Sequence, residues 1–516
     1  MARPSNGHGS YGCSRPPAPT NHRILATRNH LPARDHGCVD PPFNRYLIRV
    51  TGHLGPAMLS AFPALASERL GADTVLTGLL PDSSALYGVL AEVEALGLDL
   101  VELRKLTPVS ENGSLRARLD GVAFQADPHA LLRQLTASGS AHRCEPPGAP
   151  PQCLSPTIPP MWLVTGYQEA REVLADDRVS KRSDRVGLAP GWLMSGVRDE
   201  VGIDYLLTVD PPEHTRLRHA VLRAFTPRQI DALRPGTEKI ADRLADAVLA
   251  TEIPELIDGY ATPLPIAVIC DLLGVPLGDW DRFRWAAEQI VSPVGGQDRA
   301  DAYGWMSGYL AELIPGKRVD PGADLLSALA NDDDRLDDGE LVGMAFLLLI
   351  AGYETTAALI GAILLGVARR PELLRQLRAD PGLVPAAVEE FLRLDSPVQT
   401  GTERFATEDM YVGDTHVQRG DMLLVSLAAA NRDPARFAEP DEFRLGRSAG
   451  HVAFGYGIHH CLGAPLARME ADVAVRTLLR RVSRISLAID ESELEWRPGL
   501  LMHGVRHLPV SLDVVP

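Results

Sequence analysis

The spacing of apolar residues divides the chain into parts that predict different structures. Residues 1–42 show almost no apolar periodicity and are rich in Gly, Pro, Ser, Asn, His and Arg. Such a composition buries too little apolar surface to fold, so we expect this segment to be disordered. Residues 43–106 switch between short strand and helix patterns, and residues 107–114 form a plausible linker. Helical patterns dominate beyond them, to residue 516.

The patterns between residues 43 and 106 predict a small α+β module. The strand-like runs are Tyr46–Val50, Ala64–Leu70, Thr74–Leu80 and Leu98–Leu106, and the helical runs are Pro56–Phe62 and Ala85–Leu96. The order β-α-β-β-α-β predicts a ferredoxin-like sandwich, a fold that hosts many unrelated functions. No cluster of catalytic residue types lies in this stretch, so we expect an interaction or regulatory module.

The longest apolar run, Leu341–Ala368, predicts a buried helix rather than a membrane span. Glu354 divides the run into uncharged pieces of 13 and 14 residues. Each piece is shorter than the roughly 20 residues that a helix needs to cross a bilayer, and a carboxylate at mid-membrane is costly. Residues 1–40 are polar and proline-rich, without an apolar signal-peptide core. We therefore expect no membrane partner.

The charge and the cysteines narrow the possible partners and the compartment. A net charge of −16 argues against nucleic acid or an anionic membrane as the main partner. Six cysteines, at 13, 38, 144, 153, 270 and 461, show no paired ligand spacing. Neither a disulfide framework nor a zinc site is therefore indicated, and we expect a reducing cytoplasm.

The last cysteine, Cys461, lies in a glycine-rich loop before a helical pattern. Residues 454–463 read F-G-Y-G-I-H-H-C-L-G, and three glycines in ten residues indicate tight turns and a close approach to another group. Unpaired N–H groups at the start of the following helix favour a thiolate. A lone thiolate suits a single axial bond to haem iron. The alternative is a buried structural cysteine.

This loop resembles the haem-ligand loop of the cytochrome P-450 family, F-G-x-G-x-H-x-C-x-G. All six fixed positions are present, namely Phe454, Gly455, Gly457, His459, Cys461 and Gly463. The resemblance runs from about Leu115 to residue 516 and implies the family's mainly α fold, a large helical domain with small β-sheets. It also implies haem b, with Cys461 as the iron ligand. A proline-rich insertion at 144–160 departs from the family's short hairpin.

A second segment, D-P-P-E-H-T-R-L-R at 210–218, predicts a helix that Asp210 caps. His214 and Arg218 are four residues apart, so they share a helical face, where two cationic donors suit a buried carboxylate. The alternative is a solvated basic face. Three further arginines are expected on the same helix, namely Arg216, Arg223 and Arg228. The resemblance implies that His214, Arg218 and Arg404 bind the haem propionates, which leaves those three as a docking patch for an acidic electron donor.

The motif A-G-Y-E-T-T, at 351–356, falls within the central helix predicted over Leu341–Arg370. The flanks are apolar on all sides, so the helix should be buried, and polar residues inside it need a reason. One alternative is a kink with a back-bonded threonine. The resemblance instead implies that Ala351 lies over the haem. It also implies that Thr355 holds oxygen and water by hydrogen bonds and that Glu354 relays protons from solvent.

Glu390 and Arg393 are three residues apart, close enough to pair on a helix. Alone, E-x-x-R occurs often by chance. At this position it matches the structural ion pair of the resembled family, with Arg447 as the expected third member. We expect this group to maintain the fold rather than to do chemistry.

Three segments are expected around the substrate. Residues 185–205 lack clear periodicity and predict a mobile lid. Residues 396–402 should line the pocket, and residues 500–503 should form a turn that enters it. The candidate pocket residues are Trp192, Leu193, Met194, Leu348, Val398, Thr400 and Leu501.

The resemblance implies a haem-thiolate monooxygenase that inserts one atom of O2 into a mid-sized hydrophobic molecule. Hydroxylation or epoxidation of a natural product is the expected reaction. Electrons would come from NAD(P)H through a separate ferredoxin and ferredoxin reductase, and we expect a monomer. Two alternatives are a haem-binding auxiliary protein that recruits a partner enzyme and a peroxide-driven peroxygenase. The intact Cys461, Glu354 and Thr355 favour the monooxygenase.

Overall fold

The computed structural model describes residues 44–59, 61–62, 65–70, 73–80, 83–106, 119, 122–144, 161–186, 205–223, 225–291, 297–331, 336–447, 450–497 and 499–515. The chain divides into two compact units, Met1–Thr107 and Pro108–Pro516. Several expectations lie outside the described residues. They are the disordered segment, the linker, most of the proline-rich insertion, and the lid residues Trp192, Leu193 and Met194.

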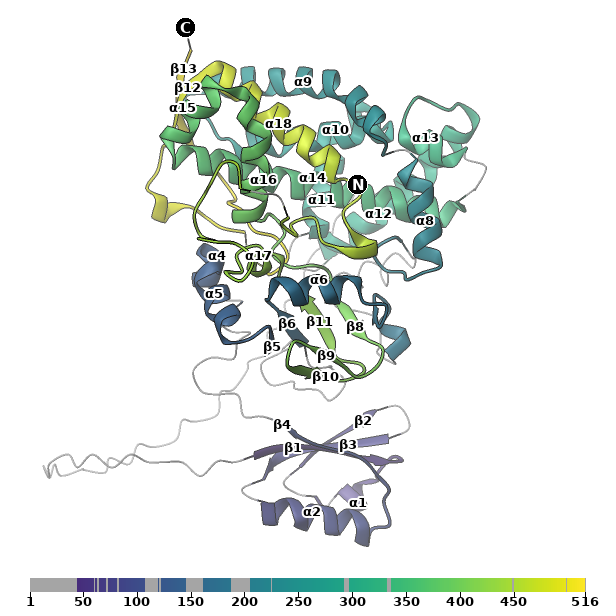
Figure 1. Cartoon of the computed structure of the whole chain (residues 1–516). Helices are drawn as coiled ribbons and strands as arrows, with labels where there is room; N and C mark the ends of the chain where they lie inside the picture. The colour runs from purple at the N-terminus through teal and green to yellow at the C-terminus, as the bar shows by residue number, and fades with distance from the viewer. Residues whose placement is uncertain are drawn as a thin grey trace, which may run out of the picture. The chain divides into compact units, whose positions relative to one another are not determined.

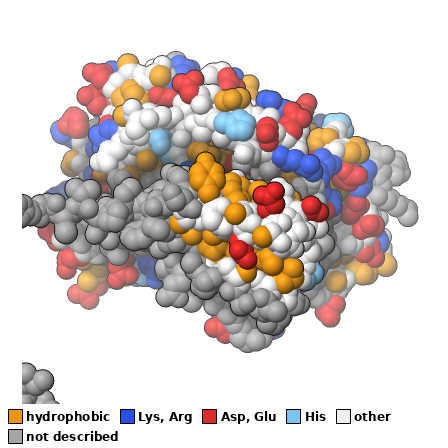
Figure 2. Space-filling model, turned by 90° about the horizontal axis from the view of Figure 1, so that it is seen from below, with side chains coloured by type: hydrophobic (Ala, Val, Ile, Leu, Met, Phe, Trp, Pro, Cys, Tyr) orange, Lys and Arg blue, Asp and Glu red, His pale blue; other side chains and the backbone are white. Residues whose placement is uncertain are grey.

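The smaller unit is a four-stranded antiparallel sheet with two helices on one face (Figure 1). Its elements are β1 (Asn44–Thr51), α1 (Pro56–Leu59), β2 (Ala66–Leu70), β3 (Asp73–Leu80), α2 (Ser83–Ala95) and β4 (Leu100–Leu106). The strands pair in the order β2-β3-β1-β4. Ile48, Val50 and Leu76 form its core. Apolar and acidic side chains share its surface in Figure 2, and Tyr87 on α2 is 69% exposed. The ferredoxin-like assignment stays a prediction.

The larger unit is mainly helical, as predicted. Its helices are α4 (Val122–Ala126), α5 (Pro128–Ser138), α6 (Tyr167–Ala175), α8 (Glu213–Leu222), α9 (Pro227–Leu249), α10 (Pro263–Leu273), α11 (Trp280–Val291), α12 (Gln297–Val319), α13 (Leu325–Ala330), α14 (Asp338–Ala368), α15 (Pro371–Ala379), α16 (Val384–Leu394), α17 (Leu427–Ala430) and α18 (Ala464–Arg481). Short 3-10 or π turns are η1 (Ser183–Val186), η2 (Ile257–Ala261), η3 (Leu277–Asp279), η4 (Pro381–Leu383), η5 (Gly457–His459) and η6 (Glu491–Glu493).

The strands of this unit form three small sheets. They are β5 (Ala141–Cys144), β6 (Met161–Val164), β7 (Val179–Ser180), β8 (Arg404–Ala406), β9 (Met410–Val412), β10 (Thr415–Val417), β11 (Met422–Val425), β12 (Val482–Leu487) and β13 (Val510–Val514). The largest sheet has the order β5-β6-β11-β8-β7, while β9 pairs with β10 and β12 with β13. Figure 1 shows most of the long helices gathered beyond one end of the five-stranded sheet.

The central helix α14 begins with a capping box. The Asp337 carboxylate accepts a hydrogen bond from the backbone N–H of Glu340, and the Glu340 carboxylate accepts one from the backbone N–H of Asp337. The helix is long and apolar enough to cross a membrane, but most of its side chains are buried against α10, α12 and α18. It is a core helix, as its sequence predicts.

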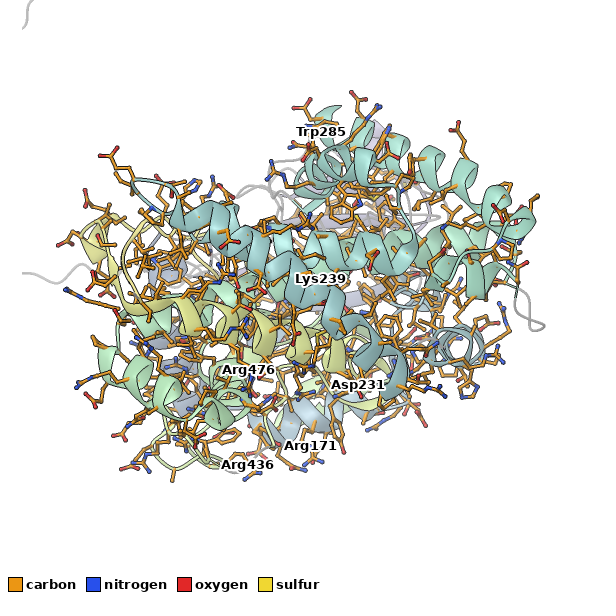
Figure 3. The ribbon with its side chains drawn as sticks, turned by 90° about the horizontal axis from the view of Figure 1, so that it is seen from above. Arg171, Asp231, Lys239, Trp285, Arg436 and Arg476 are labelled. Carbon is orange, nitrogen blue, oxygen red and sulfur yellow. The ribbon has the colours of Figure 1, made fainter. Side chains whose placement is uncertain are left out.

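The long helices α9 and α18 pack side by side and are joined by ion pairs (Figure 3). Asp472 on α18 accepts from Arg234 on α9 at 2.9 Å and from Arg476 at 2.6 Å. The hydroxyl of Tyr260 in η2 donates to the backbone oxygen of Ala474 at 2.8 Å. These contacts fix α18, and with it the cysteine loop that precedes it.

The expected single helix after Asp210 is in fact two helices. Helix α8 ends at Leu222, and α9 begins anew behind the N-cap Thr226, whose side chain forms a capping box with Gln229. Arg228 therefore lies on α9, away from Arg216. Asp210 does not cap α8 with its side chain either, because its carboxylate accepts from Ser180 and from the backbone N–H of Lys181.

Candidate active site

The cysteine loop is shaped by glycines that no other residue can replace without strain. Gly455 and Gly457 have φ of +71° and +72°, a conformation that L side chains rarely adopt. A Cβ on Gly457 would also lie 2.3 Å from the backbone oxygen of Leu174 on α6. The backbone N–H of Cys461 donates to the oxygen of Phe454 at 2.9 Å, which closes the loop.

Cys461 lies just before α18, whose N-cap is Gly463. Its side chain is open to solvent on one side, while protein atoms crowd it on the others. Burial among the surrounding atoms raises the pKa of the thiol, while the N–H groups of Gly463 and Ala464 and the charge of Arg218 lower it. The net direction is upward, because burial outweighs the helix-start N–H groups, which act in the predicted direction. An iron ion bound to this sulfur would favour the thiolate.

Four basic side chains from three segments, α8, β8 and the loop itself, come together here. The rings of His214 and His459 are 4.3 Å apart between centroids. Arg218 donates to the backbone oxygen of His460 at 2.8 Å, and Arg404 donates to that of Thr402 at 2.6 Å. Arg404, His214 and Arg218 all act electrostatically on His459, so the three expected propionate ligands and the loop histidine lie together.

A fifth basic side chain, Lys181, completes the cluster and was not predicted. It is buried, and its ammonium donates to Thr402 Oγ1 at 2.6 Å and to the oxygen of Glu403 at 2.5 Å. Burial, and then Arg404, lower the pKa of Lys181 to about 7, against the charges of Glu403 and Asp210. In the sequence it stands in R-V-S-K-R-S-D-R, which reads as an ordinary charged surface stretch.

The cluster fits a haem with its two propionate carboxylates. His214 Nε2 and His459 Nδ1 are buried and have no hydrogen-bond partner among the described residues. An ammonium carries three donors, of which Lys181 uses two in the contacts above. Burial, and then Lys181 and other cations, lower the pKa of His459 to about 2, and burial lowers that of Arg404 to about 10. Carboxylates would satisfy these donors and offset the crowded positive charge.

The motif on α14 combines an exposed alanine with one half-buried and two buried polar side chains, Thr355, Glu354 and Thr356. Ala351 is exposed although most of α14 is buried, as expected of a helix that faces a flat cofactor. The Thr355 hydroxyl donates to the backbone oxygen of Ala351 at 2.9 Å, which is the back-bonded arrangement that the sequence left as an alternative. Gly352 makes room for Ile269 on α10, since a Cβ there would lie 3.0 Å from its Cδ1.

Glu354 is buried and paired with a residue far along the chain. Arg497 Nη1 donates to Glu354 Oε1 at 2.8 Å. Local spacing does not single out Arg497, because 143 residues separate it from Glu354.

Glu390, Arg393 and Arg447 form a connected group. Arg393 donates twice to Glu390 at 2.9 Å, and Arg447 Nε donates to the same carboxylate at 3.1 Å. Arg393 also donates to three backbone oxygens, those of Asn431, Pro440 and Glu442. Burial opposes ionisation of Glu390, but these hydrogen bonds outweigh it and lower its pKa.

The described pocket candidates come together in part. Val398 bridges to Met502, and the backbone N–H of Gln399 donates to the oxygen of Leu501 at 2.8 Å. Thr400 Oγ1 donates to the oxygen of Leu500 at 3.1 Å. The turn at residues 500–503 therefore does lie against residues 398–400. Leu348, on α14, is half-buried.

The expected docking patch for an electron donor contains fewer arginines than the sequence predicts, because Arg228 lies on α9 rather than α8. A groove on α8 is lined by Arg216, His219 and Arg223, together with Pro211, Pro212, Thr215 and Ala220. Arg216 is also paired with Glu340 at the start of α14, so part of its charge is already matched.

Comparison with known proteins agrees with this site. The family model described as cytochrome P-450 matches residues 311–503. The monooxygenase PikC of Streptomyces venezuelae is 42% identical over 413 residues, which are 78% of this chain and 94% of PikC. The 6-deoxyerythronolide B hydroxylase of Saccharopolyspora erythraea is 41% identical over 367 residues, 68% of this chain and 90% of that enzyme. The tirandamycin C-bound structure of the monooxygenase TamI superposes with a TM-score of 0.69 at 44% identity, covering 76% of this chain and 99% of TamI.

The chain belongs to the cytochrome P-450 family. It is accordingly a haem-thiolate monooxygenase that uses O2, with electrons that originate from NAD(P)H. The smaller unit matches a second family model, described as a domain of unknown function (DUF8691), at residues 45–104.

Proposed function

We propose that this enzyme hydroxylates or epoxidises a mid-sized hydrophobic natural product such as a polyketide or terpenoid. The observation that carries the proposal is the set of relatives, which include 6-deoxyerythronolide B hydroxylase, mycinamicin IV hydroxylase/epoxidase and pentalenic acid synthase. Val398, Leu501 and Met502 lie where residues 398–400 meet the turn at residues 500–503, and these apolar side chains support an apolar substrate. We also propose a cytoplasmic monomer that receives electrons through a separate ferredoxin and ferredoxin reductase.

Each group of residues has a distinct part in this proposal. His214, Arg218, Arg404, His459 and Lys181 would hold the propionates, and Cys461 would supply the thiolate that binds the iron. The haem, once bound, activates O2 so that one atom enters the substrate and the other leaves as water. Thr355 would hydrogen-bond oxygen and water through its hydroxyl, and Glu354 would relay protons from solvent toward Thr355. Phe454, Gly455 and Gly463 shape the loop that places the sulfur.

The carbon monoxide difference spectrum of the reduced protein tests the site. We expect a strongly red-shifted Soret band in the natural protein and its loss in Cys461→Ala, because the thiolate is removed. A band at the position of histidine-ligated haem in the natural protein would contradict the assigned ligand. Absence of haem would favour the auxiliary-protein alternative. Spectral shifts on addition of macrolactones or terpenes, followed by product formation with ferredoxin, reductase and NADPH, test the substrate class.

A further inference from the structure

A hairpin near the end of the chain carries the turn at residues 500–503. The antiparallel bridge between Trp496 and Val505 joins its two sides. The backbone N–H of His503 donates to the oxygen of Pro397 at 2.9 Å, which attaches the turn to the segment that follows α16. These backbone contacts fix the path of the chain at the base of the turn, and contacts between rings add to them.

The ring of His503 lies between two other rings at the base of this turn. It is stacked on Trp496, with the ring centroids 4.6 Å apart and the ring planes within 11° of each other. His129, in the first turn of α5, meets the same ring edge-on, at 6.2 Å between centroids and 78° between planes. Both arrangements are ones that aromatic rings prefer. The stack thus ties the hairpin to a helix from a distant part of the sequence.

Ring contacts rather than hydrogen bonds hold these imidazoles. His503 Nδ1 and both ring nitrogens of His129 are buried and have no hydrogen-bond partner among the described residues. Burial, and then the charge of Arg432, lower the pKa of His503 to about 4, so its ring is neutral near pH 7. A neutral ring in these surroundings is positioned by the rings that it touches.

Packing against the central helix leaves space beside the His503 ring. A cavity of about 30 Å³ is bordered by His503 and Gly504 on the hairpin and by Ala358 and Gly361 on α14. A Cβ on Gly504 would lie 3.7 Å from the Cβ of Ala358, so the hairpin comes close to α14 one turn beyond Thr355. Because the contact with α14 is incomplete, the stack supplies a restraint that packing does not.

We propose that His503 is a positioning residue for the substrate, because its stack between Trp496 and His129 fixes the place of the 500–503 turn and so sets which molecules fit the pocket. The inference rests on the proposed function, in which this turn enters the substrate pocket. Met502, half-buried in the turn, is a side chain that the substrate would meet there. Without the stack the turn would take up several positions, and only a fraction of the molecules would hold the one that binds substrate.

The methyl group of Met502 reports the place of the turn without turnover. In haem-loaded protein with carbon-13 methyl groups on its methionines, the signal is assigned by its loss in Met502→Leu. Ferric iron is paramagnetic, so the difference in the shift of this signal between the ferric and the ferrous carbon monoxide forms depends steeply on its distance from the iron. That difference should change, and the signal should broaden, in His503→Ala.

Two further variants separate the stack from a general loss of structure. His503→Phe keeps a flat ring between Trp496 and His129, so it should restore the natural shift difference of Met502. His507→Ala is the matched control, because His507 is an exposed histidine of the same segment and pairs with Asp258 at 3.3 Å. It should leave the Met502 signal unchanged.

The binding of 4-phenylimidazole, followed by the shift of the Soret band, measures the effect on the pocket. This azole binds haem iron through its imidazole and places a phenyl ring in the space where the substrate would lie. His503→Ala should weaken its binding about twofold to tenfold, the range that the loss of one aromatic pair implies. Imidazole, which has no phenyl ring to reach the turn, should bind the variant as it binds the natural protein.

The outcomes separate this inference from the proposed function. An unchanged Met502 shift difference and an unchanged ratio of the two azole affinities in His503→Ala would overturn the inference and leave the proposed function standing. Failure of every macrolactone and terpene to bind, beside a changed Met502 signal in His503→Ala, would overturn the proposed substrate class alone.

Two results would count against the turn or the stack directly. An identical Met502 shift in the ferric and ferrous carbon monoxide forms of the natural protein would remove the turn from the pocket, and the inference with it. Should His503→Ala fail to load haem, His129→Leu removes the edge-on contact from α5 instead. Natural values of the Met502 shift difference and of the azole ratio in that variant would contradict the role of the stack.

Discussion

Thr355 and Thr356 are neighbours on α14 with similar local bonds and different surroundings. Thr355 Oγ1 donates to Ala351 at 2.9 Å and is half-buried, whereas Thr356 Oγ1 donates to Gly352 at 3.3 Å and is buried. Both hydroxyls are back-bonded, so the helix geometry alone does not decide which one has a chemical role. Ala351 lies one turn before Thr355 on the same helix face and is exposed, which favours Thr355 as the threonine with the chemical role.

This contrast defines a paired test of the threonine. Thr355→Ala should retain haem and the carbon monoxide band but divert most reducing equivalents to hydrogen peroxide, because the hydroxyl that orders the proton donor is gone. Thr356→Ala, which removes the neighbouring hydroxyl, should stay coupled. The ratio of product to NADPH consumed, with peroxide measured in parallel, is the readout. Equal coupling in the two variants would remove the assigned role from Thr355.

Lys181 predicts a pH dependence of haem binding. With a pKa lowered to about 7 by burial, the lysine is about half protonated at pH 7 in the absence of haem. A propionate beside it favours the charged form, so haem binding takes up a proton and haem affinity falls as pH rises from 7 toward 9.

Haem titration of the apoprotein at a series of pH values measures this effect. Lys181→Met should bind haem more weakly and with a flatter pH profile. Lys239→Met, at an exposed lysine on α9 (Figure 3), should behave like the natural protein. An equally steep profile in Lys181→Met would show that another group takes up the proton.

At the scale of elements, the group around Arg393 ties α16 to the segment that follows α17. Arg393 is 2% exposed, and its donors reach Glu390 and three backbone oxygens between residues 431 and 442. Removing one partner of a buried ion pair leaves an uncompensated charge, which costs about 3–5 kcal/mol. Arg393→Met should therefore lower the free energy of unfolding by about that amount.

Denaturant unfolding of the haem-loaded protein measures the loss, followed by the Soret band. Arg444→Met provides the comparison, because Arg444 is 44% exposed and pairs with Glu442 at the surface, where such pairs contribute about 0–1 kcal/mol. A loss in Arg393→Met no larger than in Arg444→Met would mean that the buried group does not hold these elements together.

Local spacing decides which parts of the site the sequence predicts. The cysteine loop, His214 with Arg218, and Glu390 with Arg393 are each contained in a few residues, so their patterns are readable. Lys181 meets Thr402 across 221 residues, and Arg497 meets Glu354 across 143. Neither contact leaves a trace in local spacing. The break between α8 and α9 was readable, since T-P-R-Q at 226–229 is a helix-start signal.

At the scale of the whole molecule, the chain divides at about residue 107 into two compact units. Each unit has its own apolar core, that of the smaller one being built around Ile48, Val50 and Leu76. A protein starting at residue 108 should therefore fold and load haem with the same carbon monoxide band, because the described haem-binding residues lie in the larger unit.

Comparison of the shortened and full chains by haem content and thermal unfolding checks this independence. We expect equal haem content and an unfolding midpoint of the haem domain within a few degrees. Loss of haem binding in a shortened chain that remains soluble would show that the smaller unit is needed to complete the larger one.

The contact between Glu354 and Arg497 also sets an order of events during synthesis. The ribosome releases the central helix well before the segment that supplies its counter-ion, and the same late segment brings Leu501 to Gln399 and pairs β13 with β12. Lys181, His214 and Arg218 are made before the central helix, and Arg404 and His459 are made after it but still before Arg497. A translating chain thus has all five basic residues assigned to the propionates before Arg497 can reach Glu354, and a ribosome that stalls short of residue 497 produces a protein whose buried carboxyl lacks that arginine.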